Sequence, residues 1–511
     1  MSFFRFPFCF LCFGFLTAIF ADQTRAATGQ LELIVVDQDT GTPIPFRLHL
    51  IGPKKQPRRL DKMPFWYDHN AVPGKALLRL PLGDYKFVVE RGLEYLDVTG
   101  QFTLLPFADD TKRIELHRFI DMKADGWWSG DLDVQRPLQD IELLMKADDL
   151  HMAQVVTWRN DKNLLANHPA KDSVVQFDNS RFYSPTAGAL SRRGNELLLL
   201  NLAAPLKLPG ADADFPPIVD LLLNAKKKEK GELWIDVTKP YWWDLPMLVA
   251  AGQVDSIEIA HSRLARDGST NDEADGRPRD RKRYPSYKGN GEWSQEIYFR
   301  LLNCGLRIPP SAGSGSGDAP NPVGYCRMYV HVDGDLTYEK WWKSFRAGQV
   351  FVTNGPLMKP AADGELPGHI FHADAGAKLE IQPTLTFSTR GPVNYLEIIK
   401  DGRVVKEVSF DKYVKEGKLP TIEFERSGWF ALRAVVDVQK TYRFAMTAPF
   451  YVEIGYERRI SRSAAQFFLD WVIERAKQIK QTNPERQKET LESYRQARDY
   501  WQDVLSKANA E

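Results

Sequence analysis

Two stretches of the chain alternate apolar and polar residues, a pattern typical of strands that bury one face. The first covers residues 29–120 and includes LELIVVD and KALLRLPLGDYKFVVE, and the second covers 359–457 and includes NYLEIIKDGRVVKEVSF. Short strands at close spacing, separated by turn residues, are characteristic of antiparallel β-sandwiches. We therefore predict one β-sandwich in each stretch, with a tight hairpin turn at Asp401-Gly402 in the second.

The pattern between residues 121 and 358 is different. Short apolar segments such as MAQVVTW and GELWIDVT alternate with helix-like segments such as LQDIELLMKADDL. Strands and helices in alternation indicate repeated βα units, which form a parallel sheet or a closed barrel. We expect an α/β barrel of about seven βα units here, with its site residues at the carboxyl ends of the strands.

The last segment, 458–511, has apolar residues at helical spacing, among them Phe467, Phe468 and Trp471. This spacing predicts two amphipathic helices. Their apolar faces would pack on the body of the protein or on another chain, and the second alternative would make them an oligomerisation surface.

The N-terminus has the organisation of an export signal. Arg5 precedes an apolar run from Phe8 to Phe20, and small residues follow at Ala21 and Ala26. We interpret 1–26 as a cleaved signal peptide and expect a periplasmic or extracellular protein. The alternative is a membrane anchor, but the run is short for a bilayer span, and no other segment is long enough to leave a span after cleavage.

The balance of charged residues in the chain bears on the kind of partner that it can attract. The chain has 511 residues, with 68 Lys and Arg against 67 Asp and Glu, so no overall field favours nucleic acid, and we expect none as a partner. Cys9 and Cys12 would leave with the signal. Cys304 and Cys326 would remain, either as one disulfide or as two buried thiols.

Three long phrases, at 126–161, 237–261 and 307–358, resemble the CehA/McbA family of PHP-domain metallohydrolases. The resemblance implies a PHP-like (β/α)7, TIM-like barrel over 121–358. Active members of that family carry a His-x-His strand, an Asp-His pair, a Glu and later His or Asp ligands. Their metals activate a water that attacks an ester, amide or phosphoester bond.

This chain departs from that ligand pattern. The two expected histidines fall on Asp133 and Gln135, the Asp-His position is occupied by Trp158-Arg159, and the later His-Pro phrase has Lys239 in place of the histidine. The resemblance therefore implies a degenerate metal site. We expect the following pocket residues: Asp131, Asp133, Gln135, Trp158, Arg159, Glu196, Lys239 and Glu258.

Fixed positive charges at these positions oppose a metal ion. Arginine cannot deprotonate to become a ligand, and its charge repels a cation. We hypothesise that Arg159 and Lys239 neutralise Asp131, Asp133 and Glu196 in place of a metal, so no cofactor is expected. In the alternatives, these charges face solvent, or the three carboxylates hold a divalent cation such as Mg, Ca, Mn or Zn.

Other residues are candidates for catalysis or ligand binding. His261 and Asp244 follow strand-like segments and could act in acid–base chemistry, although a lone histidine at a strand end is more often structural. Five tryptophans could line a pocket for a small-molecule or carbohydrate-like ligand, or could be core packing. They are Trp127, Trp128, Trp158, Trp242 and Trp243.

Three hypotheses of function follow. The leading one is an exported PHP-like metallohydrolase homologue that binds a ligand but does not perform metal-dependent hydrolysis, in other words a pseudoenzyme. The second is an active hydrolase of ester, amide or phosphoester bonds that uses a hard divalent cation. The third is a structural or interaction module in which the barrel is a scaffold.

Overall fold

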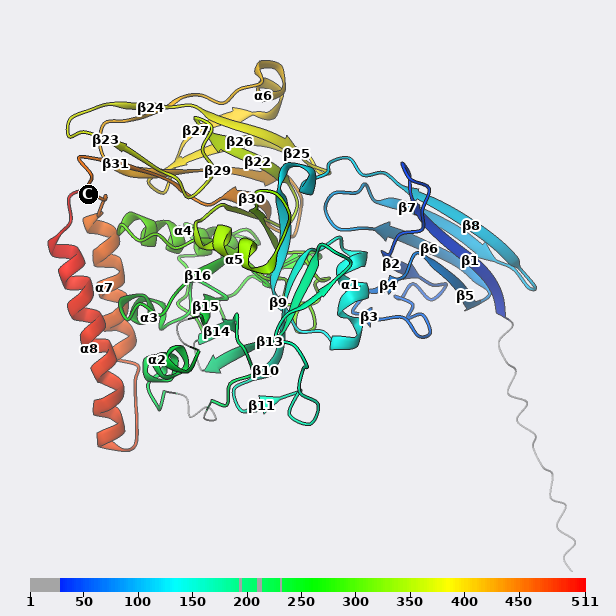
Figure 1. Cartoon of the computed structure of the whole chain (residues 1–511), viewed down its shortest axis with the longest axis horizontal. Helices are drawn as coiled ribbons and strands as arrows, with labels where there is room; N and C mark the ends of the chain where they lie inside the picture. Colours follow the sequence, from blue (N-terminus) through cyan, green and yellow to red (C-terminus); the bar gives the residue numbers. More distant parts are fainter. Residues whose placement is uncertain (1–27, 193–194, 209–213, 230–231) are drawn as a thin grey trace, which may run out of the picture.

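The computed structural model describes residues 28–192, 195–208, 214–229 and 232–511. The expected signal peptide at 1–26, with Cys9 and Cys12, lies outside the described residues. Figure 1 shows a mixed α/β molecule, in which an N-terminal group of strands lies at one end, a C-terminal group of strands lies above a central mixed region, and two long helices run along the opposite side. Among the described residues, no helix combines the length and apolar character that a bilayer crossing requires.

The N-terminal strands form two sheets. One has the order β5-β1-β8 and the other has the order β3-β4-β2-β6-β7. Their apolar faces enclose a core that includes Leu33, Leu48 and Phe87. The bounds are β1 (Thr28–Asp37), β2 (Phe46–Ile51), β3 (Phe65–Trp66), β4 (His69–Val72), β5 (Lys75–Pro81), β6 (Gly83–Glu90), β7 (Val98–Leu104) and β8 (Asp109–Leu116).

One pairing in this region differs from the antiparallel sandwich that we expected. β1 and β8 run parallel, with Leu33 opposite Lys112. Alternation of apolar residues reports which face of a strand is buried, and carries no information about the direction of its neighbour. The burial pattern of β5, in which exposed and buried residues alternate from Lys75, follows the sequence pattern.

The central region is built on a ring of strands. β9, β10 and β13 are parallel, β14 is antiparallel to both β13 and β15, and β15, β16 and β19 are again parallel. The segment after β19 returns to β9, where Val134 and Ser316 form a bridge and Gln135 N donates to Ser316 O at 2.7 Å. The bounds are β9 (Trp127–Val134), β10 (Met152–Arg159), β13 (Arg181–Arg192), β14 (Asn195–Leu200), β15 (Trp234–Val237), β16 (Ser256–Ala260) and β19 (Pro310–Ala312).

This ring differs from the expected seven repeated βα units. In the described residues of the central region, the α-helices are α1 (Ile141–Ala147), α2 (Ile218–Lys228), α3 (Leu245–Ala250), α4 (Gly289–Asn303) and α5 (Tyr338–Arg346). The connection from β10 to β13 contains the short strands β11 (Lys162–Asn163) and β12 (Val175–Phe177), and β13 passes to β14 as an antiparallel hairpin. A buried strand is apolar on both faces whether it is parallel or antiparallel, so the sequence pattern did not distinguish them.

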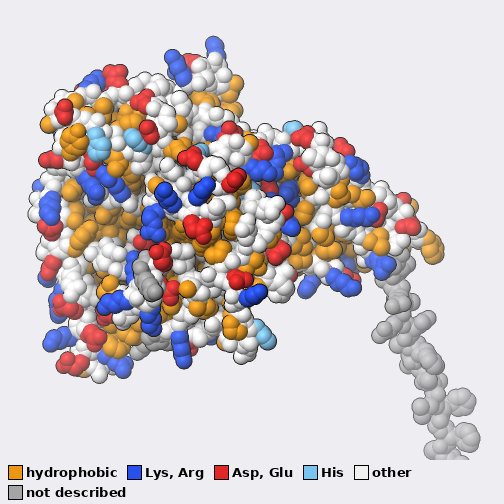
Figure 2. Space-filling model, viewed as in Figure 1, with side chains coloured by type: hydrophobic (Ala, Val, Ile, Leu, Met, Phe, Trp, Pro, Cys, Tyr) orange, Lys and Arg blue, Asp and Glu red, His pale blue; other side chains and the backbone are white. Residues whose placement is uncertain are grey.

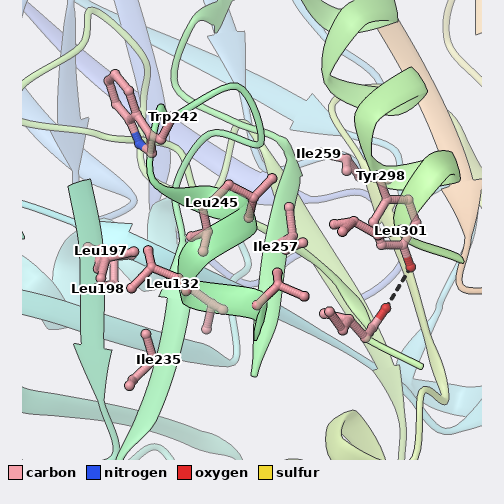
Figure 3. Packing of buried hydrophobic residues seen from close by; sticks show 14 of the residues in the cluster. Leu132, Leu197, Leu198, Ile235, Trp242, Leu245, Ile257, Ile259, Tyr298 and Leu301 are labelled. Carbon is pink, nitrogen blue, oxygen red and sulfur yellow. Dashed lines mark hydrogen bonds between the residues drawn. The ribbon is translucent and has the colours of Figure 1, made fainter. Parts of the chain in front are cut away.

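Packing between strands and helices forms the largest core. Figure 3 shows Leu132, Leu197 and Ile235 from the strands in one cluster with Leu245 of α3 and Leu301 of α4. All five side chains are fully or almost fully buried. Burial of this kind contributes about 25 cal/mol per Å² of apolar surface, so this core is the main term that holds the ring in shape.

The C-terminal strands continue the central sheet. β20 (Arg327–His331) pairs with β9 and with β21 (Val350–Thr353), and β21 pairs with β30. The remaining elements are β22 (Leu357–Ala362), β23 (Ile370–Ala373), β24 (Leu379–Ile381), β25 (Pro383–Ser388), β26 (Val393–Lys400), β27 (Arg403–Ser409), α6 (Phe410–Glu416), β28 (Ile422–Phe424), β29 (Gly428–Val436), β30 (Arg443–Thr447) and β31 (Phe450–Ile454). Asp401 and Gly402 join β26 to β27 with φ of 50° and 83°, as the predicted two-residue turn requires.

Two helices occupy the segment for which we expected them, α7 (Arg462–Ala476) and α8 (Pro484–Ser506). The side chain of Ser461 caps α7, and that of Asn483 caps α8. Both pack against α3 and against each other, and Trp501 donates from Nε1 to Pro246 O at 2.9 Å. The apolar faces of the tail are therefore covered by the body of the same chain.

Cys304 and Cys326 are both buried free thiols. Cys304 lies at the end of α4, and Cys326 Sγ donates to the carbonyl oxygen of His261 at 3.5 Å. Burial raises the pKa of the Cys304 thiol to about 12. Of the two alternatives for this pair, the structure has the two thiols.

Candidate functional site

Four of the expected pocket residues lie at one end of the ring of strands. Gln135 follows β9, Arg159 ends β10, Lys239 follows β15 by two residues, and Asp133 lies near the end of β9. Parallel strands bring their carboxyl ends to the same edge of a sheet, which is why residues so distant in the sequence meet. We call this end the barrel mouth.

Glu196 reaches the barrel mouth by a different route. It is the second residue of β14, which runs antiparallel to its neighbours, so the start of this strand lies beside the ends of β13 and β15. Thr238 Oγ1 donates to the carbonyl oxygen of Glu196 at 3.1 Å. The expectation that every site residue follows the carboxyl end of a strand was therefore wrong for this residue, although its place at the mouth was right.

A chain of hydrogen bonds crosses the mouth. Arg159 donates from Nη1 to Glu196 Oε2 and from Nη2 to Gln135 Oε1, the latter at 3.1 Å. Gln135 in turn donates from Nε2 to Asp133 Oδ1 at 2.9 Å. Arg159 thus binds Glu196, one of the three carboxylates that we expected it to neutralise. Gln135 therefore links the guanidinium of Arg159 to the carboxyl group of Asp133.

Lys239 supplies a second fixed positive charge. It is 6% exposed, its Nζ lies 5.1 Å from the ring centroid of Trp242, and it donates to Thr238 Oγ1 at 3.4 Å. Burial alone would raise the pKa of Glu196, but Lys239 and then Arg159 lower it below its usual value. Glu196 is therefore held as a carboxylate between two cations.

Asp133 is more buried than Glu196, and the nearby positive charges offset less of the cost of ionising it. Burial, followed by the charge of Glu196, raises the pKa of Asp133 to about 7, against the opposing influence of Gln135 and Lys239. A group with this pKa exchanges a proton near neutral pH. The mouth therefore joins a fixed ion pair, Arg159 with Glu196, to a carboxyl group that can hold or release a proton.

Asp131 has a structural environment. Its carboxylate accepts hydrogen bonds from Ser314 N at 2.9 Å, Ser314 Oγ at 2.5 Å, Gly324 N at 2.7 Å and Asp133 N at 3.1 Å. It is fully buried, and burial raises its pKa to about 6 despite these donors. Asp131 therefore fastens the segment after β19 to β9, and its oxygen atoms are already engaged by protein donors.

Two further buried carboxyl groups lie below the mouth. Glu258, in the middle of β16, is fully buried, and burial together with Asp236 and Asp133 raises its pKa well above the usual value. Asp236 on β15 accepts hydrogen bonds from Ser256 and Ser311, and burial raises its pKa to about 6. Sequence reasoning missed Asp236, although the polar residue within the apolar strand WIDV was a signal.

The two catalytic candidates occupy different environments. His261 follows β16, is fully buried, and has Nε2 2.9 Å from Ser294 Oγ on α4. Burial and the charge of Lys239 hold its pKa well below the usual value, so its ring is neutral. The carboxylate of Asp244 binds Arg475 Nε and Tyr494 Oη, both at 2.7 Å, so it joins α3 to the tail helices.

The tryptophans do not form one lining. Trp158 is 2% exposed and donates to Thr186 O at 2.9 Å, and a Cβ atom on Gly188 would lie 1.8 Å from its ring. Trp127 belongs to the core shared with the C-terminal strands. Trp158 is therefore core packing beneath the mouth, because its ring fills the space that Gly188 leaves open.

A groove runs from the mouth toward the N-terminal strands. It encloses about 650 Å³, and Gln135, Arg136 and Gly317 line its inner end. Phe65 and Trp66 of β3 form its aromatic wall, and Arg136 lies 5.2 Å from the Trp66 ring centroid. Gln135 therefore belongs both to the groove and to the hydrogen-bond chain of the mouth.

A second polar cluster, missed by sequence reasoning, lies in the N-terminal sheets. His49, Asp68 and His69 present ligand atoms within 4.8 Å of one another, and the register places His49 directly opposite His69. Arg266 Nη1 lies 2.9 Å from His49 Nε2, and Arg47 Nε lies 3.3 Å from it. Because two cations donate to His49, this cluster is better suited to anchor arginines than to bind a metal.

Comparisons with known proteins give no family. No family model matches the chain, and no curated protein matches it. Fibronectin(III)-like modules of Clostridium thermocellum CbhA are 19% identical over 19% of this chain and 96% of that chain, with a TM-score of 0.13. A streptococcal ancillary pilin is 19% identical over 22% of this chain and 38% of that chain, with a TM-score of 0.13. The N-terminal four Ig domains of Dscam1 isoform 8.4 are 7% identical over 84% of this chain and 73% of that chain, with a TM-score of 0.14. At these TM-scores the similarities carry no assignment.

Proposed function

We propose that the protein is an exported, ligand-binding homologue of the PHP-type CehA/McbA metallohydrolases, in which fixed cations have replaced the metal at the barrel mouth. On this proposal, 121–358 is a divergent PHP-like barrel, and the hydrolytic chemistry of the family has been lost. The observation that carries the proposal is the position of Arg159, which binds Glu196 and Gln135 where the resemblance places metal ligands.

The donor set at the mouth does not fit a transition metal. Asp133 and Gln135 stand where the family has imidazoles, and Asp131 is taken up by four hydrogen bonds from the protein. Arg159 and Lys239 contribute two positive charges beside the one carboxylate, Glu196, that is held ionised. A divalent ion bound at the mouth would be repelled by both cations or would have to displace them, which is unfavourable.

The groove beside the mouth supports ligand binding. It pairs an aromatic wall, Phe65 and Trp66, with the cations Arg59, Lys62 and Arg136. Aromatic faces bind the apolar faces of sugars and rings, and nearby cations favour an anionic substituent. We propose that the ligand is a small anionic molecule or an acidic carbohydrate, with Gln135 at the inner end of its site.

Cation binding tests the proposal. Mn²⁺ or Zn²⁺ is titrated into the metal-stripped full chain and into the double variant Arg159→Ala/Lys239→Ala, with Arg498→Ala, a surface arginine paired with Asp499, as the control. We expect no stoichiometric binding by the parent or the control, and measurable binding by the double variant. Micromolar, stoichiometric binding by the parent that is lost in Asp133→Asn would overturn the proposal.

A second candidate function is an acid–base hydrolase. Asp133 favours it, because its pKa of about 7 suits proton transfer at neutral pH. In this scheme Asp133 would accept a proton from an attacking water, while Arg159 would stabilise developing negative charge. Hydrolysis of nitrophenyl esters and phosphates that is abolished by Asp133→Asn, and unaffected by chelators, would favour this second candidate over the first.

A further inference from the structure

A buried arginine without an anionic partner lies where the three groups of strands meet. Arg327, the first residue of β20, is 1% exposed, yet it forms no ion pair with any described residue. Its Nε donates to Gly324 O and its Nη2 donates to Asp148 O at 3.0 Å, whereas its Nη1 has no hydrogen-bond partner in the part of the chain that the structure describes. A buried charge left unpaired costs several kcal/mol, so an anion is expected there.

Arg327 lines a partly open cavity of about 170 Å³. β2 and β6 contribute residues from the N-terminal strands, and Arg390 and Arg443 come from the C-terminal strands. The cavity is therefore assembled by all three parts of the molecule. Figure 2 shows positive and negative side chains interspersed over the visible face, in contrast to the concentration of arginines in this cavity.

The charges that line the cavity do not balance. Five arginines and three carboxylates give a formal excess of two positive charges. The carboxylates are already engaged, since Arg47 pairs with Glu90 and Asp148, and Arg390 pairs with Asp97. No ion pair joins Arg327 to these carboxylates, although its charge acts on Asp148 beside that of Arg47.

Arg443 is a second arginine of this cavity that has a nitrogen without a hydrogen-bond partner among the described residues. It forms no ion pair among the described residues, its buried Nε has no hydrogen-bond partner there, and its guanidinium lies 5.9 Å from the Tyr325 ring centroid. Arg327 and Arg443 line the same cavity, and each has one guanidinium nitrogen without a hydrogen-bond partner among the described residues. Guanidinium groups bind oxyanions through paired N–H donors, which favours phosphate and similar groups.

The backbone at Gly92 packs closely against the wall of the cavity. A Cβ atom on Gly92, which has φ of 54°, would lie 2.3 Å from Asp148 O and 3.4 Å from Arg327 Nη1. A side chain at this position would collide with the Asp148 backbone, so the packing beside Arg327 Nη1 requires glycine. His49 and Glu90 fix Arg266 at the neighbouring wall.

We propose that this cavity binds a divalent oxyanion of the phosphate class through Arg327 and Arg443, and that the bound anion ties the three groups of strands together. The excess of two positive charges matches the charge of a phosphate group at neutral pH. The site is separate from the barrel mouth and does not depend on the function proposed for it.

The experiment titrates inorganic phosphate into the full chain at constant ionic strength in chloride, following heat of binding and the melting temperature. We expect saturable binding of one phosphate per chain with a rise in melting temperature. Arg443→Gln should weaken binding at least tenfold, and Arg327→Lys should do the same if the first variant is unstable. Arg426→Gln, an exposed arginine on the same group of strands, should bind as the parent does.

Two further arms identify the source of the anion. Equal binding of sulfate supports a free tetrahedral dianion, and tighter binding of glycerol phosphate than of phosphate supports a phosphate ester. Absence of saturable phosphate binding, or unchanged affinity in both Arg443→Gln and Arg327→Lys, would overturn the proposal. So would binding of malonate with no binding of phosphate.

Discussion

The guanidinium of Arg159 spans the barrel mouth from the end of β10 to the carboxylate of Glu196 at the start of β14. The same guanidinium donates to Gln135 at 3.1 Å. One terminal nitrogen therefore binds Glu196, which the resemblance identifies with a metal ligand of the family. The other binds Gln135, which stands where the family has a histidine ligand. We propose that a fixed cation in this position performs the charge balance that a metal provides in the family that the sequence resembles.

Removal of that cation should destabilise the central region. Arg159→Ala leaves Glu196 with Lys239 as its main compensating charge, and we expect a loss of about 1 to 2 kcal/mol in the free energy of unfolding, since the pair is only partly buried. Urea unfolding followed by tryptophan fluorescence measures it. In the double variant Arg159→Ala/Glu196→Gln part of the loss should be recovered, and equal losses in both variants would contradict the pairing.

We expect Asp131 to contribute to the stability of the fold more than to the binding of a ligand. Asp131→Asn places an amide N–H group among donors from Ser314 and Gly324, and we expect a loss of about 2 to 4 kcal/mol. Asp318→Asn, at an exposed position nearby, is the control and should be close to neutral. A stable Asp131→Asn protein with altered cation binding would instead identify Asp131 as a metal ligand.

The tail helices should depend on Asp244. Tyr494→Phe removes a 2.7 Å hydrogen bond to its carboxylate, and we expect a loss of about 1 to 2 kcal/mol with faster hydrogen exchange in α7 and α8. Tyr456→Phe, at an exposed position, should leave exchange unchanged. If Asp244 were catalytic, the exchange of the tail would not respond to Tyr494→Phe.

His151 should make the protein less stable in acid. It is fully buried between Ser129 and Trp128, and burial lowers its pKa from 6.5 to about 3. Between these two values the unfolded chain binds a proton that the folded protein excludes, so stability falls as the pH drops through this window. This group contributes a slope approaching about 1.4 kcal/mol per pH unit.

Comparison of the parent with His151→Asn isolates this contribution from the other groups that titrate in acid. The difference in unfolding free energy between the two proteins should shrink as the pH falls from 6.5 toward 3. His168→Asn, at an exposed position, should show a constant difference from the parent. A constant difference for His151→Asn as well would mean that His151 has the same pKa in the folded protein as in the unfolded chain.

The sequence predicted elements better than it predicted how they pair. Alternating patterns identified the strands of both ends and the turn at Asp401-Gly402, because alternation and turn chemistry are local properties. The antiparallel β13–β14 hairpin and the parallel β1–β8 pair were missed, because the direction of a neighbouring strand leaves no mark in the strand itself.

The site was predictable where residues follow strand ends. Asp133, Gln135 and Arg159 meet because their strands are neighbours in the ring. The contacts of Asp244 could not be foreseen, because its partners, Arg475 and Tyr494, come from a tail more than two hundred residues away. The cavity that Arg327 and Arg443 line could not be foreseen, since its residues come together only when three parts of the chain are assembled.

The central claim is that Arg159 and Lys239 have taken the place of a metal, and elemental analysis of the full chain, purified without chelators from medium supplied with zinc, manganese and iron, tests it most directly. The account predicts well below one metal ion per chain, and the same low content in the control Arg498→Ala. Stoichiometric metal in the parent that disappears in Asp133→Asn or Glu196→Gln would contradict it.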